Sequence, residues 1–270
     1  MSILTLSTDI GLNDYIVGAI KGQLLSAVPS LNIVDITHNL SSVNYPQAAY
    51  ICSNAYKYFP GKTFHLIIVN LFEKPLKHFL IAYHKDQFIC CPDNGILTMI
   101  TSEKPESIIA VPIQSATTLD YTSRLAKVYS LLQKGALLAD VGYTIEQIEE
   151  KYPPKFAIGP DWIEGQIIFI DSFENVVVNI TKQEFEQQCQ GRKFKIVFMR
   201  NEMIETLGNN YAAAHAGEKL AWFNSAGYLE IAINKGNMAG LFGLQNYSDA
   251  TAQNALQNTL FYKTVKIFFE

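Results

Sequence analysis

The chain has 270 residues, of which 49 % are hydrophobic and 17 % are charged, and its formal net charge is −4. This composition excludes a disordered chain, and the length favours two domains. Acidic side chains outnumber basic ones and no long run of Lys or Arg occurs, so the sequence does not indicate a nucleic-acid partner.

No apolar run reaches the roughly 18 to 20 residues of a membrane span, and no basic region precedes a hydrophobic segment at the N-terminus. We therefore expect a cytoplasmic protein that does not interact with membranes. The cysteines form neither a disulfide framework nor a CxxC zinc pattern, and the histidines show no metal-binding spacing. Glycine patterns for dinucleotides or for a P-loop are absent as well, so we expect no metal and no cofactor.

Short apolar runs alternate with segments of helical period in the first half of the chain. This alternation predicts an α/β domain with a largely parallel, Rossmann-like sheet. We expect strands at 2–6, 32–36, 63–69, 79–83, 88–91 and 108–113, and helices at 15–28, 46–58, 96–101 and 127–138. The adjacent Cys90 and Cys91 end one of these strands, where alternation directs one side chain inward and the other outward.

A Pro- and Gly-containing segment near residues 152–163 marks a domain boundary. We expect the α/β domain to span residues 1–155 and a small antiparallel β domain to span residues 162–270. Strands dominate this second part, at 164–170, 176–180, 193–199, 219–223, 229–233 and 264–269.

Asp9 is the first candidate binding residue, because it follows the first strand of the α/β domain. Ligands of open α/β sheets bind at such strand ends, and a carboxylate there can accept both hydroxyls of a ribose. An equally good interpretation from this segment alone is that Asp9 caps a helix. Asp14 is better placed to cap the helix predicted from residue 15.

The second candidate site is the segment 171–175 in the β domain. Asp171, Phe173 and Asn175 put a carboxylate, an aromatic ring and an amide within five residues. An amide can match the hydrogen-bonding edge of an adenine while a ring stacks on the base. For a lone segment, a β-turn in which Asp171 bonds its own backbone is the more common arrangement.

Five segments, in order across both domains, carry a resemblance to one family. They are TDIG at 8–11, VDITH at 34–38, PDNGILT at 92–98, DSFEN at 171–175 and NSAGYLEIA at 224–232. With them the chain resembles the S-adenosylmethionine hydroxide adenosyltransferases, which form adenosine by hydrolysis and are related to fluorinases and chlorinases.

The resemblance implies an N-terminal α/β domain, a C-terminal β-barrel-like domain and a homotrimer. The ligand would lie between the first domain of one subunit and the second domain of its neighbour. Asp9 would bind the ribose hydroxyls, and Asp171 with Asn175 would lie near the methionine part or other polar groups of the ligand. The remaining residues implied for the wall of the site are Phe173, Phe223 and Ser225.

The family's water-handling triad is substituted in this chain. Where the family reads Val-Asp-Pro-Gly-Val-Gly-Thr-x-Arg, this chain has Asn70 for the aspartate and Lys77 for the arginine, and Asp120 replaces a later histidine. Asn70 cannot accept a proton at neutral pH. We hypothesise that Lys77 and Asp120 form a pair that holds the water, with Asn70 as an orienting amide.

The expected reaction is hydrolysis of S-adenosyl-L-methionine to adenosine and L-methionine, with water attacking C5′. The sulfonium leaves as a neutral thioether and needs no acid, so positioning and exclusion of bulk water can accelerate the step. One alternative is a catalytically silent protein that binds an adenosyl ligand, since Glu73 and Lys74 can obstruct the pocket. Another is an enzyme for a different 5′-activated nucleoside.

Overall fold

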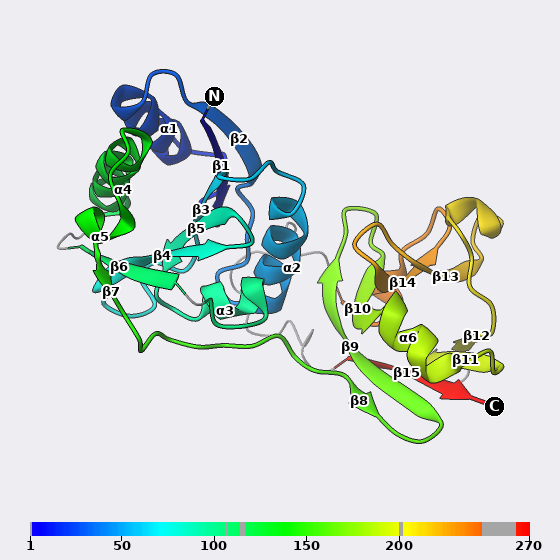
Figure 1. The fold of residues 1–270 in the computed structure, drawn as a ribbon. Coiled ribbons are helices and arrows are strands. Elements are labelled where there is room, and N and C mark those ends of the chain that lie inside the picture. Colours follow the sequence, from blue (N-terminus) through cyan, green and yellow to red (C-terminus); the bar gives the residue numbers. More distant parts are fainter. Residues whose placement is uncertain (1, 106, 114–116, 200–201, 245–262) are drawn as a thin grey trace. The chain divides into compact units, whose positions relative to one another are not determined.

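The computed structural model describes residues 2–105, 107–113, 117–199, 202–244 and 263–270. The chain divides into two compact units, Met1–Pro153 and Pro154–Glu270, which Figure 1 shows as the blue-to-green and the green-to-red parts of the ribbon. Within the described residues, no helix has the length and hydrophobicity to cross a membrane.

The first unit is built on a mixed sheet with the strand order β2-β1-β3-β5-β4-β6-β7. Strands β1 and β2, β1 and β3, and β3 and β5 pair in parallel, which confirms the predicted α/β class. Strand β4 pairs antiparallel with β5 and β6, so the other half of the sheet is antiparallel. The strands are β1 (Ile3–Thr8), β2 (Asn32–Thr37), β3 (Phe64–Ile68), β4 (His78–His84), β5 (Gln87–Pro92), β6 (Ser107–Pro112) and β7 (Tyr143–Thr144).

A two-residue turn explains why the sheet is mixed. Lys85 and Asp86 join β4 to β5, and both have positive φ angles, 48° and 61°. This is the conformation of a type I′ turn, whose twist matches that of a hairpin. Strands joined by so short a loop can pair only in antiparallel fashion, whereas parallel neighbours need a long crossover.

Helices cover both faces of this sheet (Figure 1). Helices α1 (Ile16–Ala27) and α4 (Thr118–Gln133) share one hydrophobic core with the sheet, and α2 (Tyr45–Tyr56) and α3 (Ile96–Thr101) share the other. Cys90 lies in the first core and Cys91 in the second, and both are fully buried. The expectation that one of them points outward is therefore wrong, because each face of the sheet is covered.

Helix α4 begins earlier than its periodicity predicts. The sequence pattern predicted a helix at 127–138, but α4 spans Thr118–Gln133. The hydroxyl of Thr117 accepts a hydrogen bond from the backbone N–H of Asp120 at 3.3 Å and so caps the first turn. This cap, rather than the apolar spacing further along, fixes the start of the helix. A short helix, α5 (Leu138–Val141), follows it.

The second unit is an antiparallel sheet in the order β12-β11-β15-β9-β10-β14-β13, with β8 (Ala157–Ile158) paired to β9. Its first and last strands lie near each other, so the sheet is nearly closed and barrel-like. This confirms the fold class implied by the resemblance. The strands are β9 (Trp162–Ile170), β10 (Val176–Thr181), β11 (Phe194–Met199), β12 (Glu202–Ile204), β13 (Lys219–Phe223), β14 (Tyr228–Ile233) and β15 (Thr264–Phe269).

Three helical segments accompany this sheet: α6 (Lys182–Cys189), the 3₁₀ turn η1 (Tyr211–Ala213) and α7 (Met238–Leu241). The sequence patterns did not predict them. Helix α6 has a clear local cause, because Thr181 and Glu184 form a capping box in which each side chain accepts from the other residue's backbone N–H. Phe185 of this helix is buried in the core of the unit.

The buried His65 generates a prediction on stability. Its Nδ1 lies 2.7 Å from the Thr5 hydroxyl and its Nε2 lies 2.5 Å from Gln87 Oε1. Burial lowers the pKa of His65 from 6.5 to about 4, so the folded chain binds its proton less readily than the unfolded chain. Its contribution to stability is present above pH 6.5 and is lost as the pH falls towards 4.

Between pH 7 and pH 4.5, the free energy of unfolding should therefore fall by roughly 2 kcal/mol less in a His65→Gln variant than in the wild type. Urea unfolding at both pH values measures this difference. A His215→Gln variant at an exposed site is the control and should follow the wild type. Parallel pH curves for wild type and His65→Gln would contradict the prediction.

Candidate functional site

Polar residues gather where β1, β3 and β5 end. Asp9 directly follows β1, Asn70 comes shortly after β3, and Asp93 and Asn94 follow β5. Since these strands are parallel neighbours, their carboxyl ends lie at one edge of the sheet. This is the edge at which open α/β sheets bind ligands.

The Asp9 carboxylate is anchored across two strands. Its Oδ2 accepts a hydrogen bond from the backbone N–H of Asn70 at 2.7 Å. Burial raises the pKa of this half-buried group. Asp9 does not cap a helix, because α1 begins at Ile16 and Asp14 Oδ1 accepts the Ile16 N–H at 2.9 Å. Of the two interpretations of Asp9, the structure thus leaves the binding role open and rejects the cap.

Asn70 connects Asp9 to two further polar side chains. Its φ angle of 51° lies in the left-handed region, which asparagine tolerates better than most residues. Its side-chain amide donates to Glu73 Oε2 at 2.7 Å and to the Tyr45 hydroxyl at 3.2 Å. Burial, together with the Glu73 charge, raises the pKa of Tyr45 to about 12, so the phenol stays protonated.

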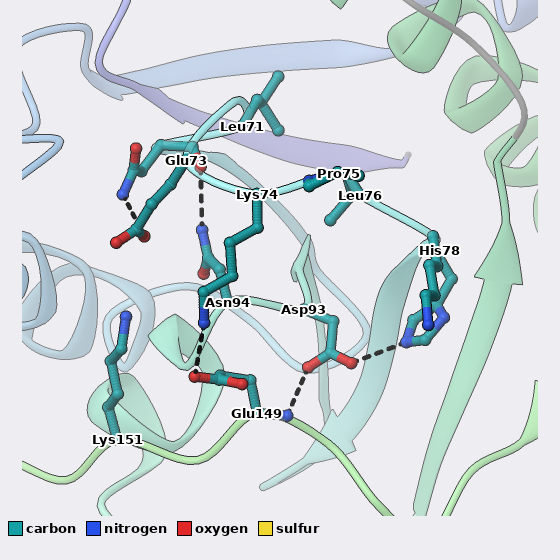
Figure 2. A pocket seen from close by; sticks show the side chains of 12 residues that line it. Leu71, Glu73, Lys74, Pro75, Leu76, His78, Asp93, Asn94, Glu149 and Lys151 are labelled. Atoms are coloured by element: carbon teal, nitrogen blue, oxygen red, sulfur yellow. Dashed lines mark hydrogen bonds and ion pairs between the residues drawn. The ribbon is translucent and has the colours of Figure 1, made fainter.

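The altered loop lines a pocket. The cavity has a volume of about 120 Å³ (Figure 2). In it, Asp93 bridges two elements, because its carboxylate accepts from the Glu149 backbone N–H at 2.8 Å and lies 2.7 Å from His78 Nε2. The lining residues are Asn70, Leu71, Glu73, Lys74, Pro75, Leu76, Lys77, His78, Asp93, Asn94, Glu149 and Lys151. The sequence analysis did not name His78, Asp93 or Glu149 as site residues.

Lys77 lines the pocket, and Asp120 lies in the first turn of α4. Both side chains are exposed, and Asp120 Oδ2 accepts from the Thr117 hydroxyl at 2.7 Å in the first turn of α4. Within the described part of the chain, no hydrogen bond or ion pair joins Lys77 to Asp120. The proposed pair therefore stays a prediction.

In the second unit, Asp171 organises a tight turn. Its Oδ1 accepts the backbone N–H groups of Phe173 and Asn175, each at 2.9 Å. Its Oδ2 accepts from the Asn175 amide at 2.9 Å. This is the Asx turn weighed in the sequence analysis, and it leaves the Phe173 ring 74 % exposed. The binding roles of these three residues stay predictions.

Phe223 and Ser225 flank a second turn, between β13 and β14. Phe223 packs partly against the core, with its ring centroid 5.5 Å from that of Phe185. Ser225 is exposed. Asn224 fixes the turn, because its Oδ1 accepts the N–H groups of Ala226 at 3.0 Å and Tyr228 at 3.2 Å.

A buried carboxylate, Glu230, lies at the centre of a polar network in the same unit. It is 4 % exposed and accepts from Trp222 Nε1 at 3.0 Å, from Asn224 Nδ2 at 3.1 Å and from the Tyr211 hydroxyl. Burial and the Glu230 carboxylate raise the pKa of Tyr211. Asn175 Nδ2 donates to the same hydroxyl at 3.1 Å, so the network reaches the Asp171 turn. In the sequence, only the presence of an acid within the apolar segment LEIA indicates this network.

Within the residues the structure describes, no cluster of three or more His, Cys, Asp or Glu side chains is arranged to hold a metal ion.

An α/β unit with a polar carboxyl edge, followed by a barrel-like antiparallel unit, defines the structural class. Two family models match this chain: the SAM hydroxide adenosyltransferase N-terminal domain over residues 4–149 and the corresponding C-terminal domain over residues 165–251. The chain belongs to the SAM hydroxide adenosyltransferase family.

Relatives and solved structures agree with this assignment. The (R)-S-adenosyl-L-methionine hydrolase of Methanocaldococcus jannaschii is 26 % identical over 90 % of this chain and 93 % of its own length. The fluorinase of Actinopolyspora mzabensis is 22 % identical over 90 % and 94 %. A conserved, uncharacterized protein from Thermotoga maritima shares the fold, with a TM-score of 0.81, 24 % identity and coverage of 98 % and 99 %.

The Glu230 network predicts a large effect on stability. A Glu230→Ala variant should lose about 2 to 4 kcal/mol of unfolding free energy, because it removes a buried carboxylate that accepts hydrogen bonds from three partly buried donors. Urea unfolding followed by tryptophan fluorescence, to which Trp162 and Trp222 of this unit contribute, measures this loss. An exposed acid in the same unit, Glu186→Ala, is the control and should change stability by less than about 0.5 kcal/mol. A Glu230→Ala variant as stable as the control would contradict the assigned network.

Proposed function

We propose that this protein hydrolyses S-adenosyl-L-methionine to adenosine and L-methionine, with water attacking C5′ of the adenosyl group. One observation carries the proposal: a half-buried carboxylate, Asp9, stands at the carboxyl edge of the sheet of a family member and receives a hydrogen bond from Asn70 N–H. Two adjacent hydroxyls of a ribose supply the donors that such a carboxylate lacks.

The named relatives support the same reaction. Four proteins that match about nine tenths of this chain at 23 to 26 % identity are named (R)-S-adenosyl-L-methionine hydrolase. We infer a homotrimer in the cytoplasm, in which the first unit of one subunit and the second unit of its neighbour share the ligand. Asp171 and Asn175 would contact the polar groups of the ligand, with Phe173, Phe223 and Ser225 along the wall. No cofactor is required, because the sulfonium departs as a neutral thioether.

The reaction itself is the first test. Purified protein incubated with S-adenosyl-L-methionine should release adenosine and methionine in equal amounts, which chromatography quantifies. Binding of S-adenosyl-L-methionine in calorimetry without any product would instead favour the silent binding protein. Binding of adenosine alone would favour an enzyme for another 5′-activated nucleoside.

Asp9→Asn tests the ribose contact. The amide keeps the size of the side chain but loses the charge that strengthens hydrogen bonds from hydroxyls, so the Kd for adenosine should rise at least tenfold. Calorimetry measures the Kd. Asp14→Asn is the matched control, since Asp14 bonds only the start of α1 in the described structure, and its Kd should stay within about twofold. Equal affinities for Asp9→Asn and wild type would exclude the ribose role.

A further inference from the structure

The substituted triad leaves the attacking water without an obvious proton acceptor, and the pocket contains a carboxylate that the sequence comparison did not assign. Glu73 lies three residues after Asn70 and lines the pocket. Its Oε2 accepts the Asn70 amide at 2.7 Å and lies 3.4 Å from the Tyr45 hydroxyl. Figure 2 shows the Glu73 side chain on the loop that lines the pocket.

The other oxygen of Glu73 is available to a ligand. Among the described residues, Glu73 Oε1 makes no hydrogen bond or ion pair, and the side chain is exposed. One oxygen is thus fixed by two neighbours while the other can accept a hydrogen bond from water. A carboxylate held in this way has a defined direction, which is what a general base needs.

Two successive hydrogen bonds connect Glu73 to Asp9. The backbone N–H of Asn70 binds Asp9 Oδ2, and the side-chain amide of the same residue binds Glu73 Oε2. If Asp9 holds the ribose hydroxyls, the reacting carbon is close, because only C3′ and C4′ separate the 3′-oxygen from C5′. Glu73 is therefore a carboxylate that a single residue, Asn70, connects to Asp9, the residue proposed to bind the ribose.

An asparagine at position 70 suits a glutamate at position 73. An aspartate at 70 would put a second carboxylate within hydrogen-bond distance of Glu73, and two like charges so close cannot both ionise freely. The Asn70 amide instead donates a hydrogen bond to Glu73 and holds the carboxylate in place without adding a second charge. The loop thus keeps one acid near Asp9. This acid is Glu73, which lies three residues after position 70, where the family has its aspartate.

We propose that Glu73 is the general base of the hydrolysis and that Asn70 and Tyr45 are the residues that position it. In the step, the oxygen of the water forms a bond to C5′ as the C5′–S bond breaks. The electron pair of the C5′–S bond goes to sulfur, which leaves as the neutral thioether of methionine. One water proton passes to Glu73 Oε1 and then to solvent. The balance is one cationic substrate and one water giving adenosine, methionine and one proton. This inference rests on the proposed function.

Two other groups compete for this role. No hydrogen bond or ion pair joins Lys77 to Asp120 among the described residues, and Asp120 accepts a hydrogen bond from the Thr117 hydroxyl. His78 lines the same pocket, and its Nε2 lies 2.7 Å from Asp93 Oδ2, which is the arrangement of an oriented imidazole. However, His78 is hydrogen-bonded to Asp93, and Asp93 in turn accepts from the Glu149 backbone N–H, so this pair of hydrogen bonds does not connect His78 to Asp9.

Glu73→Gln tests the proposal, because glutamine can still accept the Asn70 hydrogen bond but cannot take a proton. We expect kcat for adenosine release to fall at least 10²-fold, while the Kd for S-adenosyl-L-methionine stays within about threefold. Glu73→Asp should recover part of the turnover. Glu150→Gln is the matched control, since Glu150 also accepts from a tyrosine hydroxyl, that of Tyr152 at 2.7 Å, but does not line the pocket. It should keep wild-type turnover.

The outcomes separate the two proposals. If the wild type binds but releases no adenosine, the proposed hydrolysis fails and the role of Glu73 falls with it. If the wild type is active and Glu73→Gln keeps its kcat, only the role of Glu73 is overturned. A loss of turnover in His78→Gln or Asp120→Ala without a loss in Glu73→Gln would overturn it too and identify the competing base.

Discussion

The hydrogen bond from Asn70 N–H to Asp9 Oδ2 is the contact on which the candidate site depends. Parallel pairing of β1 with β3, in a register that sets Thr8 opposite Ile68, brings the two chain segments out at the same edge. The left-handed conformation of Asn70 then directs its N–H at the carboxylate and its side chain towards Tyr45 and Glu73. A residue that resists this conformation would disturb both contacts at once.

Burial makes Asp9 responsive to a ligand. Loss of hydration raises its pKa, and hydrogen bonds from the backbone N–H groups of Asn70 and of Asp9 itself compensate only part of the cost. A ligand that offers two hydroxyl donors would replace the missing water with fixed hydrogen bonds, so the carboxylate has more to gain from binding than an exposed acid would have. The Asp171 turn works differently, because its Oδ1 already accepts two backbone N–H groups and is rigid before any ligand arrives.

The sequence predicted those features of the fold and of the site that depend on residues close together in the chain. The longer strands of both units follow from apolar runs, whereas the short strands β7, β8 and β12 were not predicted, and Asp9 follows from its place after the first strand. The mixed sheet did not follow, because it depends on the positive φ angles of Lys85 and Asp86, which no apolar pattern reports. Glu73 was seen only as an obstruction, since its role near Asp9 depends on a loop whose path is set by contacts and not by periodicity. Glu230 was not named because its donors come from β13, from the turn after β13 and from η1, and only the fold brings them around one carboxylate.

The position of Glu73 also bears on the choice of nucleophile. Named relatives include fluorinases as well as hydrolases, and these reactions differ in whether the attacking group carries a charge. If Glu73 is the base proposed above, a halide would have to approach C5′ next to an acidic side chain, and like charges repel each other. Water meets no such repulsion and gains a proton acceptor from the same group. An acid that lines the pocket and has one oxygen without a hydrogen-bond partner among the described residues therefore favours water over an anion, and the Asn70 amide holds this acid in place through its other oxygen.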